Sequence, residues 1–177
     1  MKEIEIKAHL RNKKSVMDQL RVLGCVFSDP IKQEDVVYVQ KVGSLETFLS
    51  NKIYLRIRVN NGSKTIFNLK EDIGALVAIE HEVEVSSKTE MENILSIIGY
   101  QAAVGVNKIR VKTKYKGCEI CVDDVEELGA FIEMEKMSEE GDALKIQEEL
   151  FQFFESLGIK RDERVTKGYD ILMLEKA

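Results

Sequence analysis

Charged side chains alternate with apolar ones along several short segments of this chain, and one sign of charge prevails within each segment. In the first segment, Glu3 and Glu5 occupy alternate positions, and Lys7 is the basic exception. Because alternate residues of a β-strand project to the same face, each segment predicts a strand with one charged face and one apolar face. The other segments carry Arg56 and Arg58, then Glu80, Glu82 and Glu84, then Lys108, Arg110, Lys112 and Lys114, then Glu119 and Asp123, and then Glu133 and Glu135.

The chemistry available to these charges depends on where the strands place them. One charged strand face is most simply explained as the solvent-exposed face of an ordinary sheet. Several such faces together favour another arrangement, in which helices cover the apolar side of a curved sheet and the charges line a closed barrel. Charges inside a barrel must be paired or bound to a ligand. Carboxylates suit Mg²⁺ or Mn²⁺, and arginine and lysine suit phosphate, so the pattern predicts a site for a metal-polyphosphate complex.

Local sequence signals predict the elements that must hold these charges. Helices are expected to begin at Asn12, near Thr89 and at Asp142, and each is followed by a glycine that can end it. These glycines are Gly24, Gly99 and Gly158. Strands are expected at residues 3–8, 33–39, 53–59, 64–70, 78–85, 106–115, 118–125 and 130–136.

Two further segments complete the predicted fold. Gly43 to Asn51 is expected to form a loop, and Tyr169 to Leu174 is expected to form a closing strand. The expected fold class is α+β, a closed antiparallel eight-stranded β-barrel with helices packed outside. Nothing resembling an interdomain linker interrupts the chain, so we expect a single domain over residues 1–177.

Composition restricts the class of protein. Hydrophobic residues make up 44% of the 177 residues and charged residues 32%, which predicts a chain with a sizeable core rather than a disordered one. The net charge of −5 gives no basic footprint for nucleic acid. The chain carries no apolar run long enough for a transmembrane helix and no secretory signal, so we expect a cytoplasmic protein without a membrane partner.

Cysteine and histidine give weaker signals. Cys118 and Cys121 form a CxxC motif, but residues three apart in a strand point to opposite faces. We therefore expect buried, reduced cysteines rather than a metal or redox pair. His81 has the opposite parity from Glu80 and Glu82, which places it outside the barrel.

The order of these motifs resembles the CYTH family, the triphosphate tunnel metalloenzymes. Glu3-Ile4-Glu5-Ile6-Lys7 matches the family's ExExK signature, and Leu55-Arg56-Ile57-Arg58 resembles its LRxR motif. The segment from Asp123 to Glu135 is similar to its D-x-V-x-x-L-G-x-F-x-E-x-E pattern. The chain departs from the family pattern at Val37, Ile79 and Gly168. Further matches are Gln33-Glu34-Asp35, Lys70, Glu80 with Glu82, Lys108 with Arg110, and Tyr169-Asp170-Ile171-Leu172.

The resemblance implies roles for particular residues and a cofactor, Mg²⁺ or Mn²⁺. Glu5, Lys7 and Glu133 are the implied catalytic residues. Glu80 and Glu82 are expected to brace the basic walls. The implied metal ligands are Glu3, Glu5, Asp123, Glu133 and Glu135. The implied triphosphate-binding residues are Lys7, Arg56, Arg58, Lys70, Lys108 and Arg110, with Lys167 as a further candidate near the closing segment.

The resemblance is greatest to the class IV adenylate cyclase branch, which implies conversion of ATP to 3′,5′-cyclic AMP and pyrophosphate. A triphosphatase acting on inorganic, thiamine or nucleoside triphosphate needs the same charged residues and stays an alternative. A non-catalytic polyphosphate-binding module is a third possibility, which the retained carboxylates disfavour. The expected partner is ATP or another triphosphate, and a homodimer is among the assemblies left open.

Overall fold

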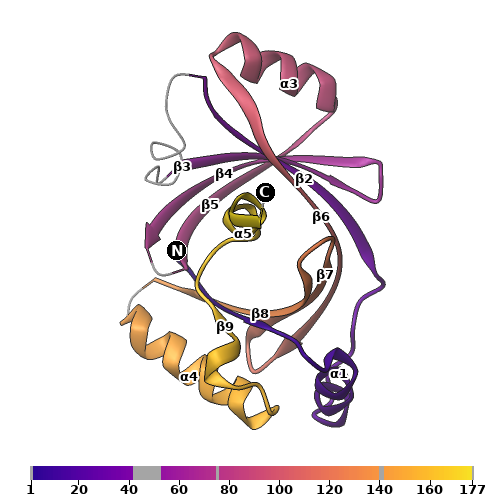
Figure 1. Cartoon of the computed structure of the whole chain (residues 1–177), viewed down its shortest axis with the longest axis vertical. Coiled ribbons are helices and arrows are strands. Elements are labelled where there is room, and N and C mark those ends of the chain that lie inside the picture. Colours follow the sequence, from indigo (N-terminus) through magenta and orange to yellow (C-terminus); the bar gives the residue numbers. More distant parts are fainter. Residues whose placement is uncertain (1, 42–52, 75, 140–141, 177) are drawn as a thin grey trace.

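The computed structural model describes residues 2–41, 53–74, 76–139 and 142–176. Its main feature is a ring of antiparallel strands, seen end-on in Figure 1. The predicted loop from Gly43 to Asn51 lies outside the described residues. Within those ranges, no helix is long and apolar enough to cross a membrane.

Eight strands form the barrel, and hydrogen bonding connects them in the order β5-β4-β3-β2-β6-β7-β8-β1. A short pairing of β1 with β5, which brings Glu3 opposite Ala78, closes the ring. The expected closed eight-stranded barrel is therefore confirmed. The strands are β1 (Lys2–His9), β2 (Ile31–Gln40), β3 (Ile53–Asn60), β4 (Lys64–Gly74), β5 (Val77–Val85), β6 (Tyr100–Tyr115), β7 (Cys118–Val125) and β8 (Gly129–Ser138).

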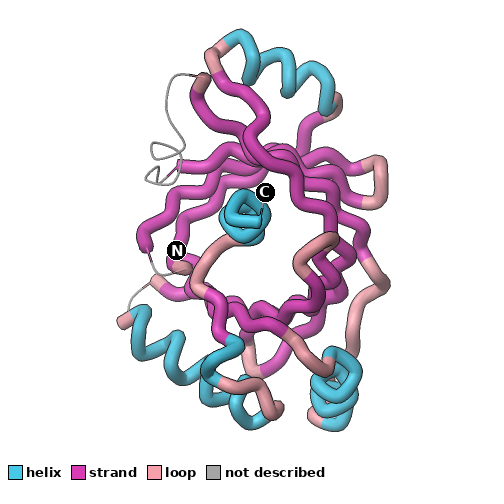
Figure 2. The backbone as a smooth tube through the Cα atoms, viewed as in Figure 1, coloured by secondary structure: helices cyan, strands magenta, loops and turns pink. Residues whose placement is uncertain are grey.

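Among the described residues, three helices pack on the outside of the ring: α1 (Lys13–Val22), α3 (Lys88–Ile97) and α4 (Ala143–Ser156) (Figure 2). The Asn12 side chain accepts a hydrogen bond from the Ser15 backbone at 3.0 Å, and Asp142 caps α4 in the same way. Such caps satisfy backbone N–H groups that the first helical turn leaves unpaired. The predicted glycine ends are also present, because Gly24, Gly99 and Gly158 all adopt positive φ angles.

The apolar core lies between the barrel wall and these helices. Ile6 of β1 and Ile120 of β7 are fully buried against Phe151 and Phe154 of α4 and Leu20 of α1. A second cluster packs Leu95 of α3 against Tyr38, Leu55 and Ile57. Since the apolar faces of the strands point outward to these helices, their charged faces point into the barrel.

The predicted closing strand from Tyr169 to Leu174 is wrong. This segment is helix α5 (Tyr169–Lys176), which follows a short 3₁₀ turn at Arg161–Glu163 and a two-residue strand β9 (Arg164–Val165) paired with β1. The β1–β5 pairing already closes the barrel, so no strand is needed there. In Figure 1, α5 projects over the interior of the ring. Its Tyr169, Leu172 and Met173 pack with Val106, Val125 and Phe131 of the barrel.

Candidate active site

The barrel encloses a cavity of about 940 Å³ that is lined by side chains from all eight strands and by residues 166–171. Strand register explains this gathering, because direct partners in an antiparallel pair face the same side. Glu5 lies opposite Glu135, and Lys7 lies opposite Glu133. The sequence-predicted site residues that line the cavity are Glu3, Glu5, Lys7, Arg56, Arg58, Lys70, Lys108, Arg110, Glu133, Glu135 and Lys167.

Three carboxylates form an acidic cluster in the cavity. One oxygen each from Glu3, Glu5 and Glu135 lies within 4.8 Å of the others. Burial raises the pKa of Glu3 to about 7 and that of Glu135 to about 8, and the neighbouring carboxylates add to both shifts. Lys70, 3.7 Å from Glu3, partly offsets the shift of that residue. Acidic groups held this close together fit a hard divalent cation with oxygen ligands.

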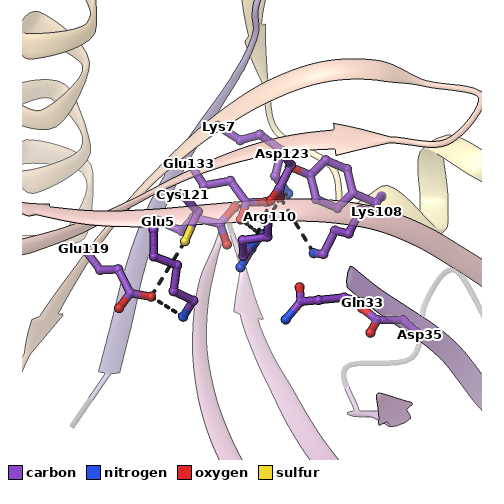
Figure 3. Close-up of polar contacts among 12 residues, drawn as sticks. Glu5, Lys7, Gln33, Asp35, Lys108, Arg110, Glu119, Cys121, Asp123 and Glu133 are labelled. Atoms are coloured by element: carbon purple, nitrogen blue, oxygen red, sulfur yellow. Dashed lines mark hydrogen bonds and ion pairs between the residues drawn. The ribbon is translucent and has the colours of Figure 1, made fainter. Parts of the chain in front are cut away.

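Glu133 lies beside this cluster but is engaged by two cations. Its Oε1 is 3.1 Å from the Lys7 ammonium, and its Oε2 accepts a hydrogen bond from Arg110 (Figure 3). Burial alone would raise its pKa, but Arg110, Lys7 and Lys108 together hold the pKa well below the usual range. Glu133 is therefore ionised and fixed in place without a metal.

Asp123 is placed away from the acidic cluster and does not line the cavity. It is fully buried, and its two oxygens accept hydrogen bonds from Arg110 at 2.7 and 2.5 Å. The Tyr169 hydroxyl donates a further hydrogen bond to Asp123 at 2.9 Å. Asp123 thus holds Arg110 in position (Figure 3), and the hydrogen bond from the Tyr169 hydroxyl holds Tyr169.

The basic side chains differ in how firmly they are held. Arg58 makes two hydrogen bonds of 2.7 Å to Asp35. Arg56 instead lies 3.7 Å from Glu80 and 3.9 Å from Glu82, and its buried Nε has no hydrogen-bond partner among the described residues. Arg58 is therefore fixed by its partner, whereas the Arg56 guanidinium is free to form stronger contacts with a ligand.

Lys7 and Lys108 occupy the same part of the cavity in different electrostatic surroundings. Lys7 lies 3.1 Å from both Glu5 and Glu133, which raise its pKa against the effect of burial. Burial and the nearby Arg110 lower the pKa of Lys108 to about 8. Lys70 pairs with Glu80 at 2.8 Å, which agrees with the bracing role expected for Glu80.

Lys167 reaches the site through its backbone rather than its charge. Its carbonyl oxygen accepts a hydrogen bond of 3.4 Å from Lys7. Its ammonium pairs with Glu175 on α5 and is half-exposed. Lys112 also lines the cavity and pairs with Glu119 at 2.6 Å, while Lys114 is exposed and does not line it.

The two nearby cysteines face opposite sides of β7, as the sequence predicted. Cys118 packs in the outer apolar core, and Cys121 points inward near Glu133 and Glu135. Burial raises the Cys121 pKa, so the thiol is protonated near neutral pH. Both are free cysteines.

Asn68 on β4, for which the sequence motifs predicted no role, is 1% exposed and donates hydrogen bonds to Glu80 and Glu82 at 2.9 and 3.3 Å. Its shared parity with Lys70 could have revealed its inward position. The contact of Tyr169 with Asp123 was also missed, since it depends on the helix that replaces the predicted strand.

Together, the closed barrel and its cavity of opposed carboxylates and cations define a β-tunnel protein with a charged interior. The chain belongs to the CYTH family, because the CYTH domain model matches residues 1–169. Members of this family are mostly metal-dependent enzymes, and the family binds triphosphates such as ATP.

Individual relatives agree with this placement. A Methanocaldococcus jannaschii protein named "Putative adenylate cyclase" is 33% identical over 172 residues, which cover 96% of this chain and 97% of the relative. A solved protein from Pyrococcus horikoshii matches with a TM-score of 0.81 and 25% identity over 99% of both chains. A Hippeastrum protein, described as a "Putative adenylyl cyclase" that "reveals a dominant triphophatase activity", shares the fold with a TM-score of 0.63. The Hippeastrum match has 17% identity and covers 95% of this chain and 91% of that one.

Proposed function

We propose that this chain is a metal-dependent enzyme that acts on a triphosphate inside the barrel, with chemistry of the class IV adenylate cyclase type. The proposal rests on the acidic cluster and the cationic side chains sharing one cavity, with Lys7 at 3.1 Å from Glu5 between the two groups. A metal-triphosphate complex needs both kinds of group, because its phosphates attract cations and its metal attracts carboxylates.

Glu3, Glu5 and Glu135 would hold Mg²⁺ or Mn²⁺. Their donors are all oxygen, and ionisation of closely spaced carboxylates becomes favourable when a divalent cation joins them. When bound, such a cation lowers the pKa of a hydroxyl and polarises phosphoryl oxygens. For Glu133 and Asp123 we propose positioning roles, since both already engage basic side chains.

The triphosphate would be held by Lys7, Arg56, Lys70 and Lys108, while Arg58 and Arg110 add positive charge from fixed positions. In the cyclase reaction, the ribose 3′-hydroxyl of ATP attacks the α-phosphorus. The bond from that phosphorus to the oxygen bridging the β-phosphate breaks, pyrophosphate leaves, and the hydroxyl proton passes to a carboxylate of the acidic cluster. The cationic walls stabilise the charge that builds up on pyrophosphate as it leaves.

The second candidate is a triphosphatase, in which water attacks the terminal phosphorus of a triphosphate bound by the same residues. The reported triphosphatase activity of the Hippeastrum protein, which shares this fold, favours keeping this candidate. The two reactions differ in which phosphorus meets the nucleophile, and the charged walls serve either one.

The deciding experiment is incubation of the purified protein with ATP, GTP, thiamine triphosphate or tripolyphosphate, each with Mg²⁺ or Mn²⁺. Cyclic AMP with stoichiometric pyrophosphate from ATP supports the cyclase. ADP with orthophosphate, or hydrolysis of tripolyphosphate without any cyclic product, assigns the protein to the triphosphatases. Failure to bind or convert any of the four compounds would reject both reactions.

A further inference from the structure

Tyr169 lies at the start of helix α5, beside Lys7 and Lys108 of the cavity. It is the first residue of α5 and only 7% exposed. The Lys7 ammonium lies 4.2 Å from the centre of its ring, and the Lys108 ammonium lies 4.8 Å from it. Both distances are within the range of cation–π attraction, which is strengthened where the cation is removed from water.

The Tyr169 ring is itself held from the barrel side. Its hydroxyl donates to Asp123 at 2.9 Å, and its ring meets Phe131 edge-on with centroids 5.0 Å apart. Asp123 is in turn fixed by two hydrogen bonds from Arg110. The ring therefore presents a fixed surface to the two lysines.

Lys108 depends on this surface more than Lys7 does. Among the described residues, the nearest carboxylate oxygen to the Lys108 ammonium belongs to Asp123 and is 3.8 Å away, which is beyond hydrogen-bonding distance. Lys7 has Glu5, Glu133 and the Lys167 carbonyl as additional partners. A lysine side chain is flexible, so a group that restricts it before a ligand arrives reduces the entropy lost on binding.

We propose that Tyr169 is a positioning residue whose ring orients Lys7 and Lys108 toward the phosphate groups of the substrate. The C-terminal helix then completes the binding site that the eight strands begin. This inference rests on the proposed function, in which both lysines hold the triphosphate.

The test distinguishes the contribution of the Tyr169 ring to ligand binding from that of its hydroxyl and from that of the packing of α5 on the barrel. Tyr169→Phe keeps the ring, and Tyr169→Leu removes it while leaving an apolar side chain. Leu172→Ala is the matched control, because Leu172 packs α5 on the same cluster and is not a contact of either lysine. For each variant, calorimetry measures the Kd for ATP and for tripolyphosphate, thermal denaturation reports folding, and steady-state kinetics separate KM from kcat.

We expect Tyr169→Leu to raise Kd and KM about fivefold to twentyfold, because Lys7 and Lys108 would then lose on binding the side-chain freedom that the ring had already restricted. Tyr169→Phe should stay within about twofold of wild type, because the ring remains. Leu172→Ala should lower the thermal midpoint and leave Kd nearly unchanged. A folded Tyr169→Leu protein with wild-type Kd, or an equal rise in Kd for Leu172→Ala, would overturn the role of the ring.

The reactivity of the two lysines without substrate tests the positioning role of Tyr169 independently of the proposed function. Acetylation of Lys7 and Lys108 by acetic anhydride, followed by mass spectrometry, should be faster in Tyr169→Leu than in wild type and Tyr169→Phe. If Tyr169→Leu does not fold, Tyr169→Met serves the same purpose. Equal labelling in all folded variants contradicts the positioning role. Absence of triphosphate binding by the wild-type protein contradicts the proposed function instead.

Discussion

Lys7 and Glu133 face each other as direct partners across strands β1 and β8, with 3.1 Å between the ammonium and Oε1. Both side chains are nearly inaccessible to water. A buried cation of this kind requires a carboxylate partner, and the register of the two strands supplies it. The pair joins the acidic side of the cavity to its basic side, because Lys7 also contacts Glu5 and Glu133 also contacts Arg110.

Glu133→Gln tests this connection. The variant should lose about 1–3 kcal/mol of folding free energy, since Lys7 and Arg110 each keep a second carboxylate partner. Turnover should fall about a hundredfold or more, because the change also alters the charge around the reacting groups. Urea denaturation and turnover at limiting Mg²⁺ measure the two effects.

Glu148→Gln is the matched control, since Glu148 pairs with Arg161 on the outer surface. That control should leave turnover unchanged. Near-wild-type turnover of folded Glu133→Gln would contradict the role assigned to Glu133.

The acidic cluster predicts that the stability of the metal-free protein depends on pH, and that a bound metal counteracts this dependence. Glu3 and Glu135 have pKa values raised from 4.5 to about 7 and about 8, so the metal-free folded chain binds more protons than the unfolded chain across this range. Its stability should therefore fall as pH rises from about 5 to 8. Mn²⁺ favours the ionised carboxylates, so its stabilising effect should be larger at pH 8 than at pH 5.

Thermal denaturation with EDTA or Mn²⁺ at both pH values checks this expectation. Glu135→Gln should flatten the pH dependence of the metal-free protein and reduce the shift caused by Mn²⁺. A Mn²⁺ shift that is equal at both pH values, and unaffected by Glu135→Gln, would argue against a metal at these residues.

Truncation of Arg58 should lower the stability of the protein, whereas truncation of Arg56 should weaken substrate binding. Arg58→Ala leaves the buried Asp35 without its bidentate partner and should cost about 3 kcal/mol of stability. Arg56→Ala breaks only contacts of 3.7 Å or longer, so it should leave the thermal midpoint nearly unchanged and raise KM. Denaturation curves and KM for the two variants make the comparison. Equal destabilisation by both changes would contradict the conclusion that Asp35 fixes Arg58 while Arg56 is available to bind a ligand.

Activity with Mg²⁺ should not require the Cys121 thiol. Its thiol lies near Glu133 and Glu135, but burial raises its pKa, and Mg²⁺ prefers oxygen ligands. Cys121→Ser should therefore change the Mg²⁺ concentration for half-maximal activity by no more than about twofold. A tenfold rise in that concentration, with folding intact, would make the sulfur a ligand.

Strand parity explains why so much of this architecture could be predicted from the sequence. Alternation at Glu3, Glu5 and Lys7, and at Arg56 and Arg58, fixes which side chains share a face, and the apolar opposite faces require helices outside. Parity says nothing about partners on other strands. The engagement of Asp123 by Arg110 and Tyr169 therefore appears only when the register and α5 are known.

The C-terminal segment shows a second limit. Tyr169 to Leu174 is too short and apolar for periodicity to separate a strand from a helix. Tertiary contacts determine the structure of this segment. Because β1 pairs with β5, Tyr169, Leu172 and Met173 pack together on the barrel as one face of a helix.

A ³¹P NMR time course of ATP with the purified protein and Mg²⁺ tests the proposed cyclase activity most directly. We predict that ATP signals are replaced by those of 3′,5′-cyclic AMP and pyrophosphate in equal amounts, and that excess EDTA stops the reaction. Appearance of ADP and orthophosphate without cyclic AMP would contradict the cyclase assignment. ATP signals that stay unchanged in shift and intensity would contradict the proposal that this tunnel binds and converts ATP.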